Sequence, residues 1–391
     1  MDVSAINLDH FQYLYQEVDL AGESAAIVHI YSEYPDYSYA IEPSEGFTCV
    51  DDVARSIVLL TEYYQKIDPD EQILVQIKKM MQFVLHMQNE NGYFNNFIWH
   101  DLSINTTYQT TVAELNWWSL RAFWALEKAL PLIKADTTLQ KKSTKAIERL
   151  LQNIERDLPL DNRITEQVEG LTVPTWLPQR YAGDQAAILA LSLLGHYERT
   201  QDEQVLPKIE ALAEGILLLQ KGDAKQFPHF AFMSWKNLWH AWGNSQSYVL
   251  LKIGKTLNKP VYIEAALREL DHFYPYLLEN GFAEAFWVQQ TKEQSSELKR
   301  NPFPHIAYGV RPMVWAALEA YKITNEEKYL ALAQELGAWF SKDNAAQIPM
   351  YDPASGRCFD GILSPSDVNQ NSGAESTIEC LLTLIRLQAA S

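Results

Sequence analysis

The chain has 391 residues, of which 47% are hydrophobic, so it is long enough to bury a large core. Its formal net charge of −18 comes without a basic stripe, and such a surface repels a phosphate backbone, which argues against a nucleic-acid partner. No run of about 18 uncharged apolar residues occurs, so we expect no membrane span.

The cysteines and the amino terminus indicate a reducing compartment. Cys49, Cys358 and Cys380 are an odd number without CxxC spacing, which argues against a disulfide framework or a structural zinc. The first residues contain no basic segment followed by an apolar run. We therefore expect a cytoplasmic protein, or a secreted or periplasmic one if a signal peptide has been removed before Met1.

Two kinds of helical segment alternate along the chain. Amphipathic segments have one apolar stripe and one charged face, as surface helices do, whereas the others are apolar nearly all round and so should be buried on every side. In chain order we predict 4–18 (outer), 50–65 (inner), 70–89 (outer), 112–131 (inner), 139–157 (outer), 184–198 (inner), 203–220 (outer), 245–256 (inner), 259–280 (outer), 308–322 (inner), 325–341 (outer) and 374–388 (inner).

This alternation predicts the fold. The six buried segments recur about every 60–70 residues, a repeat of pattern more than of residue identity. Helical hairpins that can hide their apolar faces only against their neighbours close naturally into a double-walled ring. No linker rich in Pro, Gly or Ser divides the chain. We predict an all-α protein, an (α/α)6 toroid of six helical hairpins, formed by a single domain over residues 1–391.

The connections are asymmetric. Those from an inner to an outer segment are short, whereas those from an outer to an inner segment are long, and long loops in a compact domain usually carry function. The long connections are 90–111, 158–183, 221–244, 281–307 and 342–373, together with the Tyr-rich segment 29–49. In a closed ring they would gather on one face, at the amino-terminal ends of the inner helices.

Polar side chains occur at every inner-helix start and should converge on one central pit. The catalytic candidates among them are the carboxylates Asp52 and Asp184, followed by Asp51 and Glu375. The substrate-binding candidates are Arg55, Glu114, Asn116, Trp117, Trp118, Gln185, Trp235, Trp239, His240, Asn244, Gln246, His305, Tyr308, Arg311, Asp360 and Asn371. In a partly dry pit, one carboxylic acid can protonate a glycosidic oxygen while a second carboxylate activates water or attacks carbon.

A structural interpretation of the same acids stays open. Thr48 with Asp51, Thr111 with Glu114 and Ser372 with Glu375 each match the capping-box spacing. Asp184, which follows a glycine, could itself be an N-cap. Asp52 fits no such pattern and lies in a helix with few solvent-facing positions, so the pit is its most natural environment. Asp360 could equally hold loops together.

Aromatic residues are abundant, with 11 Trp and 20 Tyr. Their flat faces with a polar edge suit a sugar ring, which is apolar on one side and hydroxylated on the other. Seven tryptophans fall in the long loops or first helical turns, where stacking on sugar is expected: Trp99, Trp117, Trp118, Trp176, Trp235, Trp239 and Trp242. Three fall in mid-helix and are expected in the core: Trp124, Trp315 and Trp339.

A metal or cofactor is not expected. His229, His240 and His305 lie near the predicted mouth but lack HxxxH or any other tight ligand spacing. Histidines in such positions more often orient a neighbour or contact substrate hydroxyls.

The whole pattern resembles the six-hairpin glycosidase superfamily, which includes glucoamylase-like, family 9 endoglucanase-like and unsaturated-glucuronyl-hydrolase-like enzymes. The resemblance rests on six alternating hairpins, acids at inner-helix starts and Trp-rich loops, and it covers nearly the whole chain. The stretch KDNAAQIPMYDPASGRCFDG, before the last inner helix, is similar in placement to the carboxyl-terminal active-site loops of such enzymes. No catalytic residue is transferred from any one family, because fold analogy does not fix function.

Three functions follow in order of preference. The first is a glycoside hydrolase acting on an oligosaccharide or polysaccharide through two of the four carboxylates. The second is a polysaccharide lyase or sugar epimerase, with Tyr308 or His240 as the base and Arg311 and Asn244 neutralising a uronate. The third is a carbohydrate-binding protein without turnover.

Overall fold

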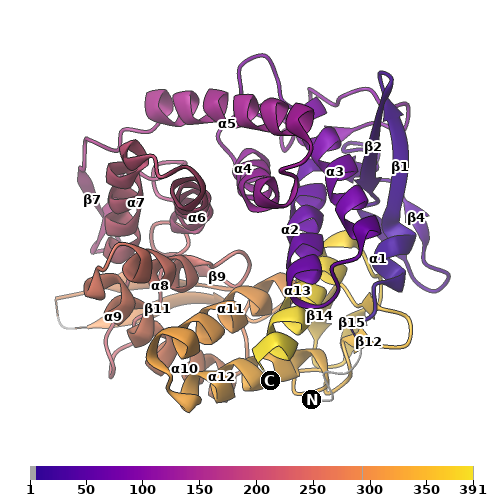
Figure 1. Ribbon diagram of the computed structural model, residues 1–391. Helices are drawn as coiled ribbons and strands as arrows, with labels where there is room; N and C mark the ends of the chain where they lie inside the picture. Colours follow the sequence, from indigo (N-terminus) through magenta and orange to yellow (C-terminus); the bar gives the residue numbers. More distant parts are fainter. Residues whose placement is uncertain (1–5, 293, 391) are drawn as a thin grey trace.

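The computed structural model describes residues 6–292 and 294–390. Within them, six buried helices follow one another around a ring, and the last packs against the first (Figure 1). These inner helices are α2 (Val50–Lys66), α4 (Trp117–Ala129), α6 (Gly183–Thr200), α8 (Gln246–Thr256), α11 (Ala307–Thr324) and α13 (Ala374–Ala390). Their starts agree with the predicted ones except at α4, which begins later because the Asn116 side chain caps it.

A second set of helices packs outside the ring. α3 (Glu71–His86) contacts α2, α7 (Leu206–Leu218) contacts α6, and α12 (Glu327–Gly337) contacts α11. The rest of the set is α5 (Thr137–Asp157), α9 (Pro260–Arg268), α10 (Tyr274–Asn280), the π-helical turn Glu269–Phe273 between the last two, and the 3-10 turns Leu130–Leu132, Glu203–Val205 and Ala338–Phe340. Inner and outer helices therefore alternate along the chain as their polarity predicts.

The amino-terminal segment corrects the prediction of a helix over 4–18. Residues 4 and 5 lie outside the described part, α1 spans only Asp9–Leu14, and a hairpin of β1 (Tyr15–Leu20) and β2 (Glu23–Val28) follows. Ala21 and Gly22 turn the hairpin with φ of 56° and 87°, a conformation that favours glycine. β2 packs against α2 and α3, so a hairpin covers the ring where a helix was expected.

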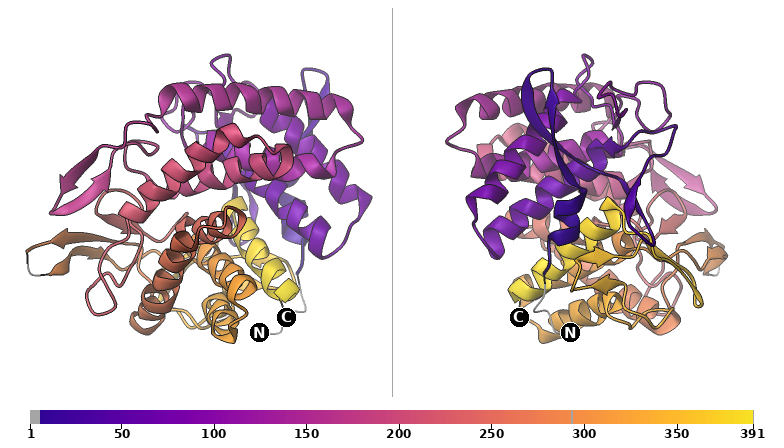
Figure 2. Two further views of the ribbon diagram at one scale, coloured as in Figure 1. Left: turned by 60° about the vertical axis from the view of Figure 1, so that its left-hand side comes forward. Right: turned by 90° about the vertical axis from the view of Figure 1, so that its right-hand side faces the viewer.

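Short antiparallel strands within the long connections also correct the all-α prediction in detail. The strands are β3 (Tyr31–Glu33), β4 (Ser38–Ala40), β5 (Thr48–Cys49), β6 (Phe97–Ile98), β7 (Thr165–Val168), β8 (Leu171–Pro174), β9 (Leu238–His240), β10 (Ala285–Gln290), β11 (Ser295–Asn301), β12 (Tyr351–Asp352), β13 (Arg357–Cys358), β14 (Gly361–Ser364) and β15 (Asp367–Asn369). They pair locally, and the one three-stranded sheet among the described residues has the order β11-β10-β9. The left view of Figure 2 shows the hairpins at 165–174 and 285–301 projecting away from the chain's carboxyl terminus.

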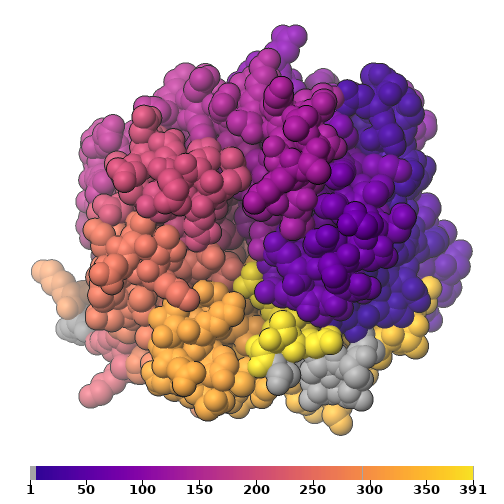
Figure 3. Space-filling model, viewed as in Figure 1, coloured from indigo at the N-terminus to yellow at the C-terminus, as the bar shows by residue number. Residues whose placement is uncertain are grey.

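The inner helices share one direction. Side chains from their later turns, such as Glu62, Lys128, Lys252 and Arg386, line a single cavity. This cavity opens on the face seen in Figures 1 and 3, where the space-filling surface is hollowed near its centre. The first turns and the long connections therefore lie on the opposite face. None of the described helices combines the length and hydropathy needed to cross a membrane.

The centre of the ring is filled with large side chains. Trp124, Trp315 and Trp339 are 6%, 1% and 0% exposed, which confirms their predicted place in the core. Trp124 packs edge-on against Trp315, with 6.3 Å between the ring centroids.

Candidate active site

The start of α2 places Asp52 at the centre of the candidate site. Cys49 caps the helix, because its Sγ accepts a hydrogen bond from the Asp52 backbone N–H at 3.4 Å. The Cys49 thiol lies 3.3 Å from Asp52 Oδ2 and donates to it. One turn later, Arg55 Nη2 donates to Asp52 Oδ1 at 2.7 Å. A buried cap and a buried cation thus fix both oxygens of this carboxylate.

Arg55 joins the first inner helix to the last. Its Nη1 donates to Glu375 Oε2 of α13 at 2.6 Å and lies 3.6 Å from Glu379 Oε1. The side chains of Arg55 and Asp52 are 4% and 3% exposed, whereas that of Glu375 is 42% exposed. Two candidate carboxylates therefore share one guanidinium, one recessed and one open to solvent.

The pKa values of the two carboxylates that share Arg55 are displaced in opposite directions. Burial raises the pKa of Asp52 to about 6, against the opposing effect of Arg55. Burial also acts to raise the pKa of Glu375, but the charge and hydrogen bond of Arg55 outweigh it and lower that pKa overall. Below about pH 6 a protonated acid can therefore stand beside an ionised carboxylate, which is the division of roles that acid–base catalysis requires.

Asp51 belongs to a second cluster, around Tyr308 of α11. Arg121 of α4 contacts Asp51 Oδ1 at 2.7 Å through Nη1 and donates to Tyr308 Oη at 2.8 Å through Nη2. The guanidinium carbons of Arg55, Arg121 and Arg311 lie 5.1, 5.2 and 5.6 Å from the centroid of the Tyr308 ring. Arg311 is itself paired with Glu379 at 2.6 Å and is 2% exposed, so it is committed to the protein interior.

Asp184 lies in the first turn of α6, beside His240. The distance from His240 Nε2 to Asp184 Oδ2 is 2.9 Å, and Asp184 Oδ1 accepts from the Gln185 backbone N–H at 2.6 Å. His240 stacks on Trp242, with centroids 3.7 Å apart and 15° between the ring planes. His240 Nδ1 makes no hydrogen bond within the described residues. The carboxylate therefore fixes one nitrogen of the imidazole, while the other nitrogen is buried without a partner.

A close backbone approach joins the two halves of the site. Gly243 has φ of +76°, and a Cβ added there would lie 3.1 Å from both Trp117 Cη2 and Tyr308 Oη. Trp117 lies 5.8 Å from Trp242, and the Arg121 guanidinium lies 4.8 Å from the Trp117 ring. Contacts therefore run without a break from Asp184 through these rings to Arg121 and Arg55, and they connect the starts of α6, α4, α11 and α2.

A pocket of about 330 Å³ opens beside the Asp52 half of this site. It lies between the first turns of α2, α11 and α13 and the Tyr-rich segment. The side chains that give it its polar character are Tyr31, Glu45, Asp51, Asp52, Arg55, Asp360, Glu375 and Ser376, while Ile30, Phe97 and Ile306 supply apolar surface. Its size and mixed lining fit a small hydroxylated ligand.

The capping alternatives are wrong for these acids. Thr48 Oγ1 donates to the Val28 carbonyl and Thr111 Oγ1 accepts from the Phe97 backbone N–H, so neither caps a helix. Ser372 Oγ accepts from the Cys358 backbone N–H. The N-cap of α6 is Ala182, which leaves Asp184 inside the helix. These hydroxyls instead make hydrogen bonds with backbone groups of other segments.

The expected stacking tryptophans divide into two groups. Trp118, Trp176 and Trp239 are only 2–3% exposed and fill the core, so the prediction that they stack on sugar is wrong. Trp118 and Trp176 donate their indole N–H to the carbonyls of Val112 and Ala211. Trp99, Trp117 and Trp242 are partly buried, and Trp235 is 38% exposed with Lys236 Nζ 4.1 Å from its ring centroid.

Several other binding candidates hold loops together. Asp360 accepts from the Gly373 backbone N–H at 2.8 Å and from Ser376 Oγ at 2.6 Å, and so fastens the start of α13. Asn371 Oδ1 accepts from the Tyr34 backbone N–H. Glu114 is exposed and accepts from Asn116 Nδ2. Asp360 nevertheless also lines the pocket.

The remaining candidates make their contacts mostly within the protein. Gln185 Nε2 donates to Asn116 Oδ1 at 3.2 Å, while Gln185 Oε1 and Gln246 Oε1 make no hydrogen bond within the described residues. Asn244 accepts from Ser234 Oγ and donates to the His240 carbonyl, so it is not free to neutralise a uronate. His305 Nε2 contacts the Pro302 carbonyl at 2.7 Å, and burial lowers its pKa.

Two residues of the candidate site escaped the sequence analysis, Arg121 and Glu379. Each is a charged residue inside an otherwise apolar helix, and this was the signal that could have revealed them. No group of three or more His, Cys, Asp or Glu side chains within residues 6–292 and 294–390 is placed to hold a metal ion.

No family model and no curated protein matches the sequence. Solved structures do match the fold. A sugar epimerase from a ruminal bacterium has a TM-score of 0.65 at 11% identity, with 92% of each chain covered. Cellobiose 2-epimerase from Bacillus thermoamylovorans has a TM-score of 0.63 at 12% identity, again with 92% of each chain covered.

A family 76 glycoside hydrolase from a bovine Bacteroides thetaiotaomicron strain has a TM-score of 0.62 at 13% identity, covering 93% of this chain and 73% of that one. The chain has the fold of the six-hairpin glycosidase superfamily. The predicted (α/α)6 toroid is thereby confirmed as a fold. At such identities the fold alone is shown, and it carries both sugar epimerases and glycoside hydrolases.

Proposed function

We propose that the protein is a glycoside hydrolase acting on an oligosaccharide or polysaccharide, with Asp52 and Glu375 as its catalytic pair. The observation that carries the proposal is the pair itself. Both carboxylates lie on one guanidinium at the edge of one pocket, and their pKa values are displaced in opposite directions. Two carboxyl groups with separate protonation states are the common requirement of glycoside hydrolysis.

In this mechanism Asp52, protonated below about pH 6, donates its proton to the leaving glycosidic oxygen. Glu375, ionised and accessible, attacks the anomeric carbon or activates the water that does so. Arg55 keeps Glu375 ionised and holds both carboxylates in place. Asp51 and Asp184 then serve as positioning residues, through Arg121 and His240 respectively.

The surrounding surface would bind further sugar units. Trp117, Trp242 and the exposed Trp235 offer aromatic faces, and Tyr31 borders the pocket. In the proposal, residues 1–391 form one catalytic domain, a double ring whose long loops supply the binding face.

The experiment compares Asp52→Asn and Glu375→Gln with the wild-type protein on natural oligosaccharides and nitrophenyl glycosides. Both variants should lose at least about a hundredfold in kcat, the usual contribution of a positioned acid or base. Glu114→Gln is the matched control, because Glu114 lies near the mouth but outside the pocket, and it should retain wild-type turnover. Wild-type turnover in both pocket variants would refute the assignment.

A sugar epimerase is the second candidate, favoured by one specific observation. His240 pairs with Asp184 through Nε2 at 2.9 Å, and a histidine held by a carboxylate is a group suited to moving a proton at a sugar carbon. Proton NMR in D₂O would distinguish the two reactions. Deuterium incorporated at a sugar carbon without cleavage, and abolished by His240→Asn, would support epimerisation, whereas a new reducing end would support hydrolysis.

A further inference from the structure

A second cavity lies on the face opposite the candidate active site. It measures about 590 Å³ and is lined by the later turns of the inner helices, together with Lys134, Gln140 and Thr144. It shares no lining residue with the pocket that contains Asp52. Asp52 and Glu62 are ten residues apart on α2, so the two cavities are separated by about 15 Å along the helix. The proposed hydrolysis makes no use of this second cavity.

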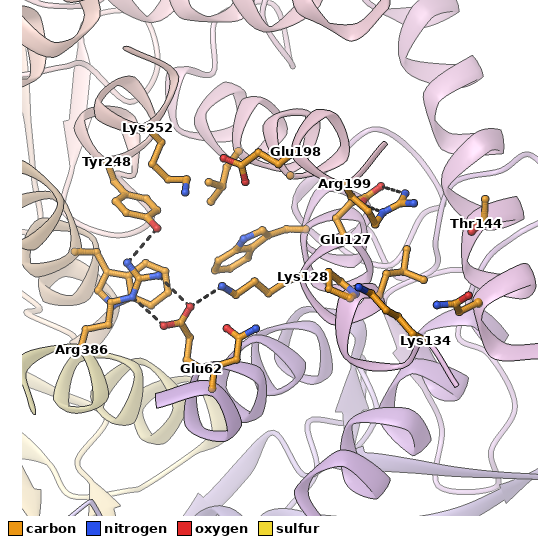
Figure 4. Close-up of a pocket in the computed structure, with 18 residues that line it drawn as sticks. Glu62, Glu127, Lys128, Lys134, Thr144, Glu198, Arg199, Tyr248, Lys252 and Arg386 are labelled. Atoms are coloured by element: carbon orange, nitrogen blue, oxygen red, sulfur yellow. Dashed lines mark hydrogen bonds and ion pairs between the residues drawn. The ribbon is translucent and has the colours of Figure 1, made fainter. Parts of the chain in front are cut away.

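The wall of this cavity is rich in cations, although the protein carries a net charge of −18. Five cationic side chains line it, against three glutamates: Lys128, Lys134, Arg199, Lys252 and Arg386 against Glu62, Glu127 and Glu198. Figure 4 shows them converging from several helices. An excess of positive charge in a concave site raises the local concentration of anions.

Two of the glutamates are already neutralised. Arg386 donates to both oxygens of Glu62, at 3.0 and 3.1 Å, and Lys128 Nζ lies 2.7 Å from Glu62 Oε1. Arg199 donates to both oxygens of Glu127, at 2.7 and 2.9 Å. Arg386 also stacks on Trp315 at 3.7 Å from the ring centroid and donates to the Tyr248 hydroxyl. These side chains are therefore already paired with one another.

Lys252 and Lys134 are different. Neither makes an ion pair within 4.0 Å or a hydrogen bond to any residue in 6–292 or 294–390, and they lie on different walls of the cavity (Figure 4). The neighbouring Tyr248 hydroxyl and the carboxylates of Glu198 and Glu319 raise the pKa of Lys252, so this lysine is charged at physiological pH. Gln65, Gln140 and Thr144 add side-chain donors that make no hydrogen bond within the described residues.

We propose that this cavity binds a phosphorylated small molecule, whose phosphate group is attracted by the unpaired ammonium groups of Lys252 and Lys134 on two of its walls. Each ammonium group is a compact charge with three donors, which suits contact with phosphate oxygens. The volume exceeds what a bare phosphate ion needs and lies in the range of metabolite sites. Thr144 and the two glutamines would contact the remainder of the ligand. The proposal does not depend on the reaction at the other face.

The competing explanation is structural, since lysines near helix carboxyl termini also offset the helix dipole. Calorimetric titration separates the two, with inorganic phosphate, glucose 6-phosphate, glucose and citrate as probes. We expect saturable binding of inorganic phosphate, tighter binding of glucose 6-phosphate, and no binding of glucose. Binding of citrate with none of either phosphate probe would overturn the assignment to phosphate.

The variants are Lys252→Gln and Lys134→Gln, with Lys322→Gln as control. Lys322 is a 55% exposed lysine that pairs with Glu319 and does not line the cavity. Each cavity variant should weaken phosphate binding about tenfold, while the control should not change it. Lys134 is exposed, so its variant tests binding even if Lys252→Gln impairs folding. Unchanged phosphate affinity in Lys134→Gln would overturn the proposal. It would also be overturned if the cavity variants had lowered melting temperatures while the wild type bound no phosphate, because the lysines would then have only a structural role.

Discussion

Replacing Arg55 with methionine tests whether one cation holds the candidate carboxylates in their charged arrangement. The substitution keeps the side-chain length but leaves Asp52 and Glu379, which are 3% and 0% exposed, without the cation they share with Glu375. Removing one partner of a buried ion pair costs about 3–5 kcal/mol. With an unfolding entropy of about 2.1 cal/mol/K per residue over 391 residues, this lowers the melting temperature by about 4–6 °C.

Scanning calorimetry at pH 7 and pH 5 measures this loss. The deficit should shrink at pH 5, because carboxylates that lose their cation have raised pKa values and escape the cost of burial by taking up protons. Arg156→Met is the control, since Arg156 forms an exposed pair with Asp157 and its loss should leave the melting temperature nearly unchanged. A melting temperature in Arg55→Met no lower than in the control would refute the reasoning.

Three further predictions follow from the same structure. Because burial raises the pKa of Asp52 to about 6, kcat/KM should fall as pH rises above that value, and a profile flat from pH 5 to 8 would contradict its role as the acid. Gly243→Ala should lower activity and should reduce the free energy of unfolding by about 1–3 kcal/mol. Gly281→Ala is the control and should lose less, because Gly281 has the same φ of +76° but nothing within 4 Å of an added Cβ. Equal losses of stability and activity in the two variants would refute the steric argument. Burial raises the pKa of Glu269 from 4.5 to about 7, so its contribution to stability is complete below pH 4.5 and is lost as pH rises through 7. Over that range, the free energy of unfolding of the wild type and of the exposed control Glu264→Gln should therefore fall by roughly 3 kcal/mol more than that of Glu269→Gln, as denaturant titrations would show.

The architecture was largely predictable from the sequence because it rests on local periodicity. A helix without a polar face must be buried, and six such helices separated by amphipathic ones leave few arrangements other than a ring. The prediction failed where a tertiary partner decided the outcome. The hairpin after Leu14 packs against α2 and α3, and the start of α4 depends on the Asn116 side chain.

The position of the candidate site could be predicted, but its hydrogen bonds and ion pairs could not. Acids at inner-helix starts were identified, and Asp52 was separated from the capping patterns by its position alone. Its partnership with Glu375 runs through Arg55, which is 320 residues from Glu375, and no spacing rule reaches so far. Likewise, Trp118 and Trp239 lie in the same kind of segment as Trp117, and only packing against distant elements buries them.

A crystal structure of the Glu375→Gln variant with a bound oligosaccharide tests the central claim most directly. We predict a sugar in the pocket lined by Asp52, with the glycosidic oxygen within about 3.2 Å of the Asp52 carboxyl and the anomeric carbon facing residue 375. A sugar bound at the Asp184–His240 pair, with no glycosidic bond near Asp52, would contradict it.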